Sequence, residues 1–79
     1  MKMENIEKKL KNVFSVVFEL DPNFINENSS PDNIDNWDSL KHMMLISALE
    51  EEFDIQFSDQ EMLELLNYKL IKHILTEKF

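Results

Sequence analysis

The chain has 79 residues, of which 43% are hydrophobic and 30% charged, a balance typical of one small globular domain rather than a disordered segment. It has no cysteine, which excludes a disulfide framework and a thiolate zinc site. Its longest unbroken apolar run, residues 43–46, is too short to cross a membrane, and the N-terminus lacks the apolar core of a signal peptide. We therefore expect a single cytoplasmic domain, residues 1–79, with no membrane span.

The net charge of −8 is concentrated in the middle of the chain. Residues 19–64 carry thirteen acidic residues against Lys41 alone, whereas the segments on either side are each slightly positive. This distribution disfavours nucleic acid as a partner, because nucleic acid attracts lysine and arginine. It favours partner proteins with basic surfaces, although acidity that merely keeps a small domain soluble is an equal alternative.

The first helix is predicted over Met3–Leu20, because apolar residues recur there at i, i+4, i+7 and i+8. It should end at Asp21-Pro22, since proline disfavours helical geometry in the residue before it. Residues 22–37 form a connection rich in Asn, Ser and Asp, and a loop of that length is usually functional. Four apolar residues should hold this loop to the core: Phe24, Ile25, Ile34 and Trp37. We interpret Trp37 as a packing residue in preference to a ligand contact.

The second helix should begin at Asp38 or Ser39, both good N-cap residues, and continue to Phe53. Its apolar residues form two rows rather than one. The row that should face the core contains Leu45, Leu49 and Phe53, with Ile46 beside it. The row on the other side contains Leu40, Met44 and Ala48, with Glu51 beside it. A second apolar row on a surface helix indicates a further layer of protein or a partner.

Residues 58–61, Ser-Asp-Gln-Glu, form a capping box that predicts a short third helix, and Asn67 can cap a last helix. The apolar contacts of the third helix should come from Met62, Leu63, Leu65 and Leu66. Those of the last helix should come from Leu70, Ile71, Ile74 and Leu75. No segment reads as a strand, so the fold is predicted to be all-α with four helices and a long first loop.

The sequence offers little catalytic chemistry. His42 and His73 are too far apart to form a local ligand pair, and His42 is interpreted as a surface helix residue or else a partner contact. Residues 50–52 are three glutamates whose side chains point in different directions around a helix. We interpret them first as a solvated acidic face, and only second as a metal or partner site. There is no glycine-rich phosphate loop, because the chain has no glycine. We therefore expect neither an enzyme nor a metal site.

Ser39 is notable for its position at a helix N-terminus after an exposed loop. Unpaired backbone N–H groups and the positive end of the helix dipole favour a phosphate ester on such a serine. On position alone, a simple N-cap serine is the commoner explanation. Three motifs add a second argument: Asp38-Ser39-Leu40, the run Ala-Leu-Glu-Glu-Glu-Phe at residues 48–53, and the segment 57–61. With these motifs the chain resembles the acyl carrier protein family over nearly its whole length.

The resemblance implies a four-helix bundle of the acyl-carrier type, with 4′-phosphopantetheine attached to Ser39 and Asp38 adjacent to it. A phosphopantetheinyl transferase would install this arm from coenzyme A, and its thiol would carry acyl groups as thioesters. The partners implied are acyl- or aminoacyl-activating and transferring enzymes with basic docking surfaces, and the chain is expected to be a monomer. The residues expected to meet partners are Leu40, Lys41, Met43, Met44, Glu50 and Glu51. The residues expected to line the interior that shelters a bound chain are Leu45, Ile46, Leu49 and Phe53.

Several residues depart from the usual pattern of the family. Asn36 stands where a glycine is common, Trp37 follows it, and Lys41 and Met44 replace residues that are usually acidic in fatty-acid carriers. These departures favour a specialised carrier, for example in lipid, saccharide or secondary-metabolite synthesis. Two alternatives remain. One is an aminoacyl carrier of the D-alanyl or peptidyl kind; the other is a helical interaction module without a prosthetic group, in which Ser39 would only cap the helix and Ser39→Ala would cost about 1 kcal/mol.

Overall fold

The computed structural model describes residues 3–79, and this part of the chain contains four α-helices and no strand. In chain order the elements are α1 (Met3–Phe18), the single 3-10 turn η1 (Pro22–Phe24), α2 (Ser39–Phe53), α3 (Asp59–Glu64) and α4 (Tyr68–Lys78). The predicted all-α fold with a long first loop and a short third helix is confirmed. The turn η1 was not expected from the sequence.

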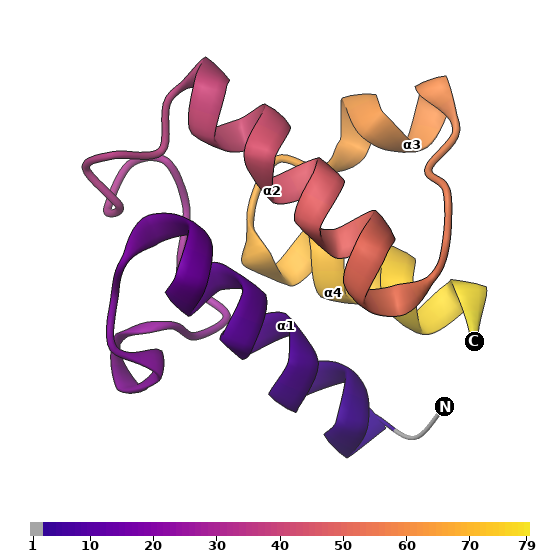
Figure 1. The fold of residues 1–79 in the computed structure, drawn as a ribbon, viewed down its shortest axis with the longest axis horizontal. Coiled ribbons are helices and arrows are strands. Elements are labelled where there is room, and N and C mark those ends of the chain that lie inside the picture. Colours follow the sequence, from indigo (N-terminus) through magenta and orange to yellow (C-terminus); the bar gives the residue numbers. More distant parts are fainter. Residues whose placement is uncertain (1–2) are drawn as a thin grey trace.

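The two long helices pack side by side and run in opposite directions, with α4 crossing behind α2 and α3 leading into it (Figure 1). Each helix turns one apolar face inward, and these faces form a continuous core. The rows predicted to face the core are buried on α1 and α2, including Phe14, Leu45 and Leu49, and Ile71 on α4 is buried as well. The predicted contact of Leu70 on α4 is wrong, because its side chain is 37% exposed. The start of α2 is left at one end of the bundle, next to the long loop.

The first helix ends at Phe18, two residues before the prediction, because Glu19 adopts the left-handed conformation with a φ of 56°. The backbone N–H of Leu20 then donates to the carbonyl of Ser15 at 3.1 Å, which closes the helix end before the proline is reached. Asp54, with a φ of 52°, ends α2 in the same way. Glycine normally fills such positions, and this chain has none.

The long loop is anchored to the core through Ile25, Ile34 and Trp37, as predicted, and through a hydrogen bond from the N–H of Tyr68 to the carbonyl of Ser29 at 3.1 Å. The prediction that Phe24 is a fourth anchor is wrong, because its side chain is 74% exposed. The turn η1, which Phe24 ends, buries none of its three residues. The side chain of the next residue, Ile25, is the one that is buried in the core.

The short helix α3 begins as predicted: Ser58 accepts from the N–H of Glu61, and Glu61 accepts from the N–H of Ser58. Leu65 is buried and Met62 packs against the core, but the predicted contacts of Leu63 and Leu66 are wrong. These two side chains are 74% and 61% exposed. A helix of six residues has only one face against the bundle, so Leu63 on another face points to solvent, and Leu66 lies beyond the end of the helix.

Lys72 on α4 joins three parts of the chain. Its Nζ atom lies 2.6 Å from Oε1 of Glu7 on α1 and 2.6 Å from Oε1 of Glu27 in the long loop. These two carboxylates raise the pKa of Lys72 above its ordinary value, with Glu27 as the first cause. The ion pairs hold the loop against the face of the bundle formed by α1 and α4.

Candidate functional site

The start of α2 is capped by Asp38, not by Ser39. The carboxylate Oδ1 of Asp38 accepts from the N–H of Lys41 at 2.8 Å, and the backbone of Asp38 is extended, as an N-cap residue requires. Ser39 is consequently the first residue of the helix itself. Its side chain is exposed to solvent. The Ser39 hydroxyl is therefore not the group that caps the helix.

Two side chains fix the start of α2 to the end of α1. The Nδ2 atom of Asn36 donates to the carbonyl of Phe18 at 3.2 Å, and the Nζ atom of Lys41 donates to the carbonyl of Val17 at 3.2 Å. Both carbonyls belong to the last turn of α1, where helix geometry leaves acceptors unpaired and the dipole favours a cation. The two departures Asn36 and Lys41 thus have a structural use, and the Lys41 ammonium is directed at α1.

Trp37 and His42 form a pair beside Ser39. Trp37 is buried, as expected for a packing residue, and its ring lies against Phe14 and Phe18 of α1 with centroid separations of 5.5 and 5.0 Å. Its Nε1–H donates to Nδ1 of His42 at 3.0 Å, and the two rings are stacked. His42 is half-buried, so its interpretation as a surface residue is wrong, and burial lowers its pKa. The sequence alone could not reveal this hydrogen bond.

Exposed apolar side chains surround Ser39 on the outer side of α2. Leu40 and Met44 of the predicted outer row are 69% and 45% exposed, and Met43, expected to meet partners, is 59% exposed. Ala48 departs from the outer row: this residue is half-buried in a shallow depression between α1 and α2 and packs against the core. The apolar surface is therefore confined to the N-terminal half of α2, next to Ser39.

The two glutamates expected to meet partners have different surroundings. Oε2 of Glu50 accepts from the N–H of Phe57 at 2.9 Å, so this half-buried carboxylate holds the connection between α2 and α3. Glu51 is exposed and lines the depression beside Ala48. The four residues expected to line the interior, Leu45, Ile46, Leu49 and Phe53, are all buried in the core.

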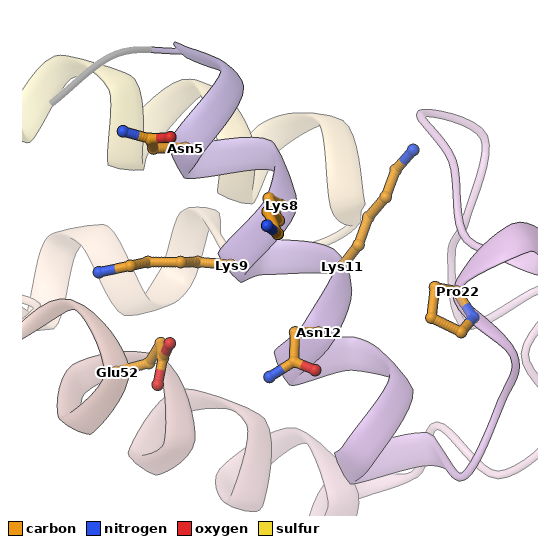
Figure 2. Close-up of a pocket in the computed structure, with 7 residues that line it drawn as sticks. All are labelled: Asn5, Lys8, Lys9, Lys11, Asn12, Pro22 and Glu52. Carbon is orange, nitrogen blue, oxygen red and sulfur yellow. The ribbon is translucent and has the colours of Figure 1, made fainter.

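A second depression lies at the other end of α2, lined by Lys8, Lys9 and Lys11 of α1 and by Glu52 (Figure 2). Glu52 is the thirteenth residue after Ser39 on α2, which is a distance of about 20 Å along the axis. This depression is therefore separate from the start of α2. Within residues 3–79, no group of His, Asp or Glu side chains is arranged to hold a metal ion, and no helix is long and apolar enough to cross a membrane.

We compared the sequence and the fold with those of known proteins. No protein-family model matches the chain. It is 41% identical over 59 residues to the acyl carrier protein of Buchnera aphidicola subsp. Schizaphis graminum, covering 75% of each chain. It is 42% identical over 60 residues to the acyl carrier protein of the subspecies Acyrthosiphon pisum (strain Tuc7), covering 75% of this chain and 74% of that one. The chain belongs to the acyl carrier protein family.

The fold of this acyl carrier protein family member also matches a solved structure. Rv0033 of Mycobacterium tuberculosis, assigned as an acyl carrier protein, superimposes on this chain with a TM-score of 0.81 and a sequence identity of 24%. The superposition covers 94% of this chain and 99% of the Rv0033 chain. At that identity the match concerns the fold alone. Acyl carrier proteins are carriers and not enzymes, which agrees with the lack of catalytic chemistry in the sequence.

Proposed function

We propose that this chain carries acyl groups on a 4′-phosphopantetheine arm attached to the Oγ atom of Ser39 and presents them to partner enzymes. The observation that supports this most directly is the division of tasks at the start of α2, where Asp38 caps the helix and the Ser39 hydroxyl stays exposed. The chain has no cysteine, so it has no thiol of its own. When bound, the arm supplies a thiol that holds the acyl group as a thioester.

The surroundings of Ser39 fit a phosphodiester. The first backbone N–H groups of α2 lie next to it, and the positive end of the helix dipole stabilises negative charge there. Attachment would form a bond between the Ser39 oxygen and the phosphorus nearest the pantetheine of coenzyme A. The adenosine bisphosphate half of coenzyme A would leave, and the hydroxyl proton would pass to the transferase. Asp38 and Asn36, through their own hydrogen bonds, would keep the attachment point in place during this reaction.

The partner surface on this proposal is mainly apolar close to Ser39. Leu40, Met43 and Met44 would enter apolar pockets of partner enzymes, and Glu51 would meet basic residues at the edge of the contact. Lys41 and Glu50 would contribute less, because their charged groups already bind backbone groups of this chain. A surface of this kind favours a specialised carrier over the fatty-acid carrier of primary metabolism.

The test is the intact mass of the protein after incubation with coenzyme A, Mg²⁺ and a broad-specificity phosphopantetheinyl transferase. The wild type should gain one phosphopantetheine and Ser39→Ala none. Ser47→Ala is a matched control, since Ser47 is also an exposed serine on α2, and it should be modified like the wild type. Because Asp38 is the cap, Ser39→Ala should change the free energy of unfolding by less than about 0.5 kcal/mol. Modification of Ser39→Ala, or a wild type left unmodified by two different transferases, would contradict the proposal.

A further inference from the structure

The pair formed by Trp37 and His42 holds an imidazole ring close to Ser39. The hydrogen bond from Nε1 of Trp37 to Nδ1 of His42 measures 3.0 Å, and the ring planes are inclined by 21° with centroids 6.1 Å apart. Trp37 is itself packed against Phe14 and Phe18 of α1. The orientation of the His42 ring is therefore set by the core and not by solvent.

This hydrogen bond determines which nitrogen of His42 carries the proton. An indole N–H can only donate, so Nδ1 must act as the acceptor and cannot bear a hydrogen. The neutral ring then carries its hydrogen on Nε2. A second proton on the ring would have to go to Nδ1 and would break the bond to Trp37. Burial disfavours that charged form and lowers the pKa of His42.

His42 follows Ser39 by three residues on α2, which brings its Nε2–H group to the same side of the helix as Ser39. The two residues are one helical turn apart, a spacing that brings Cβ atoms within about 5–6 Å of one another. The charged groups beside them are already engaged: the Asp38 carboxylate binds the N–H of Lys41, and the Lys41 ammonium binds the carbonyl of Val17. Beyond Trp37, α1 contributes the apolar rings of Phe14 and Phe18, and the acidic Glu19 follows at its end.

We propose that His42, held by Trp37, is a positioning residue that donates its Nε2–H to the phosphodiester on Ser39 and so holds the base of the arm. This inference rests on the proposed function, because it requires the phosphodiester to be there. It gives a function to the hydrogen bond between Trp37 and His42, which packing of the Trp37 ring alone would not require. A tryptophan and a histidine joined by a hydrogen bond select one tautomer, and that tautomer presents a donor where an anion is to be attached.

Attachment of the arm should then change the titration of His42. A negative charge next to an imidazole stabilises its protonated form, so the pKa of His42 should rise by about 1 pH unit between the unmodified and the modified protein. His73 is an internal control, because it is exposed on α4 and pairs with Glu77 at 3.1 Å. The imidazole ¹⁵N shifts of His73 should be the same in both forms of the protein.

The experiment is a pH titration of the ¹⁵N-labelled protein by NMR, before and after modification confirmed by mass. Imidazole ¹⁵N shifts should show the Nε2–H tautomer of His42 in the unmodified protein, and its pKa should rise on modification. The ³¹P resonance of the modified protein should follow the same pKa. In Trp37→Phe, which keeps an aromatic ring without the donor, His42 should become a mixture of tautomers and the change on modification should shrink. In His42→Gln the pH dependence of the ³¹P resonance should disappear.

The outcomes separate the two proposals. Attachment of the arm to Ser39 without a rise in the pKa of His42, and without a ³¹P resonance that follows that pKa, would refute the positioning role. That result would leave the carrier function standing. The same holds if His42 carries its hydrogen on Nδ1. If no arm can be attached to Ser39, the carrier function and this inference both fail.

Discussion

The carboxylate of Glu50 holds the connection between α2 and α3, and its removal should destabilise the fold. Oε2 of Glu50 accepts from the N–H of Phe57 at 2.9 Å, and the side chain of Phe57 is only 4% exposed. Glu50→Ala would leave this N–H without its acceptor. Hydrogen bonds to charged groups contribute about 1.5–3 kcal/mol, and since Glu50 is only half-buried we expect a loss of about 1.5–2 kcal/mol. For a domain of this size, that corresponds to a fall in Tm of roughly 6 to 16 °C.

Two variants control for charge and for shape. Glu51→Ala removes the same charge from an exposed position on the same helix and should change the free energy of unfolding by less than about 0.5 kcal/mol. Glu50→Gln keeps an oxygen acceptor and should cost less than about 1 kcal/mol. The assay is urea unfolding followed by circular dichroism, with the slope m held in common. Equal losses in Glu50→Ala and Glu51→Ala would show that only charge matters at these positions and that the hydrogen bond to Phe57 contributes nothing measurable.

Two further predictions concern the backbone and the core. Glu19→Gly should raise the free energy of unfolding by about 0.5–1 kcal/mol, because glycine adopts a positive φ without strain. Glu4→Gly, in the first turn of α1, should instead lower it by up to about 1 kcal/mol, because it removes an acid that the helix dipole favours there. Equal effects in urea unfolding would contradict this. Burial, and then Glu7, raise the pKa of Tyr68 to about 12. Because the unfolded chain loses this proton first, stability should fall between roughly pH 10 and 12. Tyr68 is the one tyrosine of the chain, so its absorbance should report the titration directly, and a midpoint near 10 in the folded protein would oppose the assignment.

The features that depend on neighbours in sequence could be predicted. Asp38 as a possible cap, the capping box at Ser58 and the cap at Asn67 all act on backbone groups three residues away. The buried row of α2 follows from helical spacing alone. The serine at the start of α2 could be identified for the same reason, since its neighbours in the chain carry the resemblance to the family.

The features that depend on distant residues could not be predicted. The partners of Lys41, His42 and Glu50 are a carbonyl of α1, an indole in the loop and an N–H beyond the end of α2. Spacing along one helix cannot reveal such partners, so the sequence predicts only that these residues lie on the surface or meet other proteins. Apolar character was equally insufficient for Phe24 and Leu63, because whether a side chain is covered depends on the whole arrangement of the bundle.

On the proposed function, the arm is attached to Ser39 and to no other serine. Trypsin cleaves after Lys11 and Lys41, which releases a peptide of residues 12–41 that contains Ser39 and three other serines. Tandem mass spectrometry of this peptide from the modified protein should place the phosphopantetheine on Ser39, with fragments that contain only Ser15, Ser29 and Ser30 unmodified. Phosphopantetheine on one of those three serines, or on a different peptide, would contradict the account.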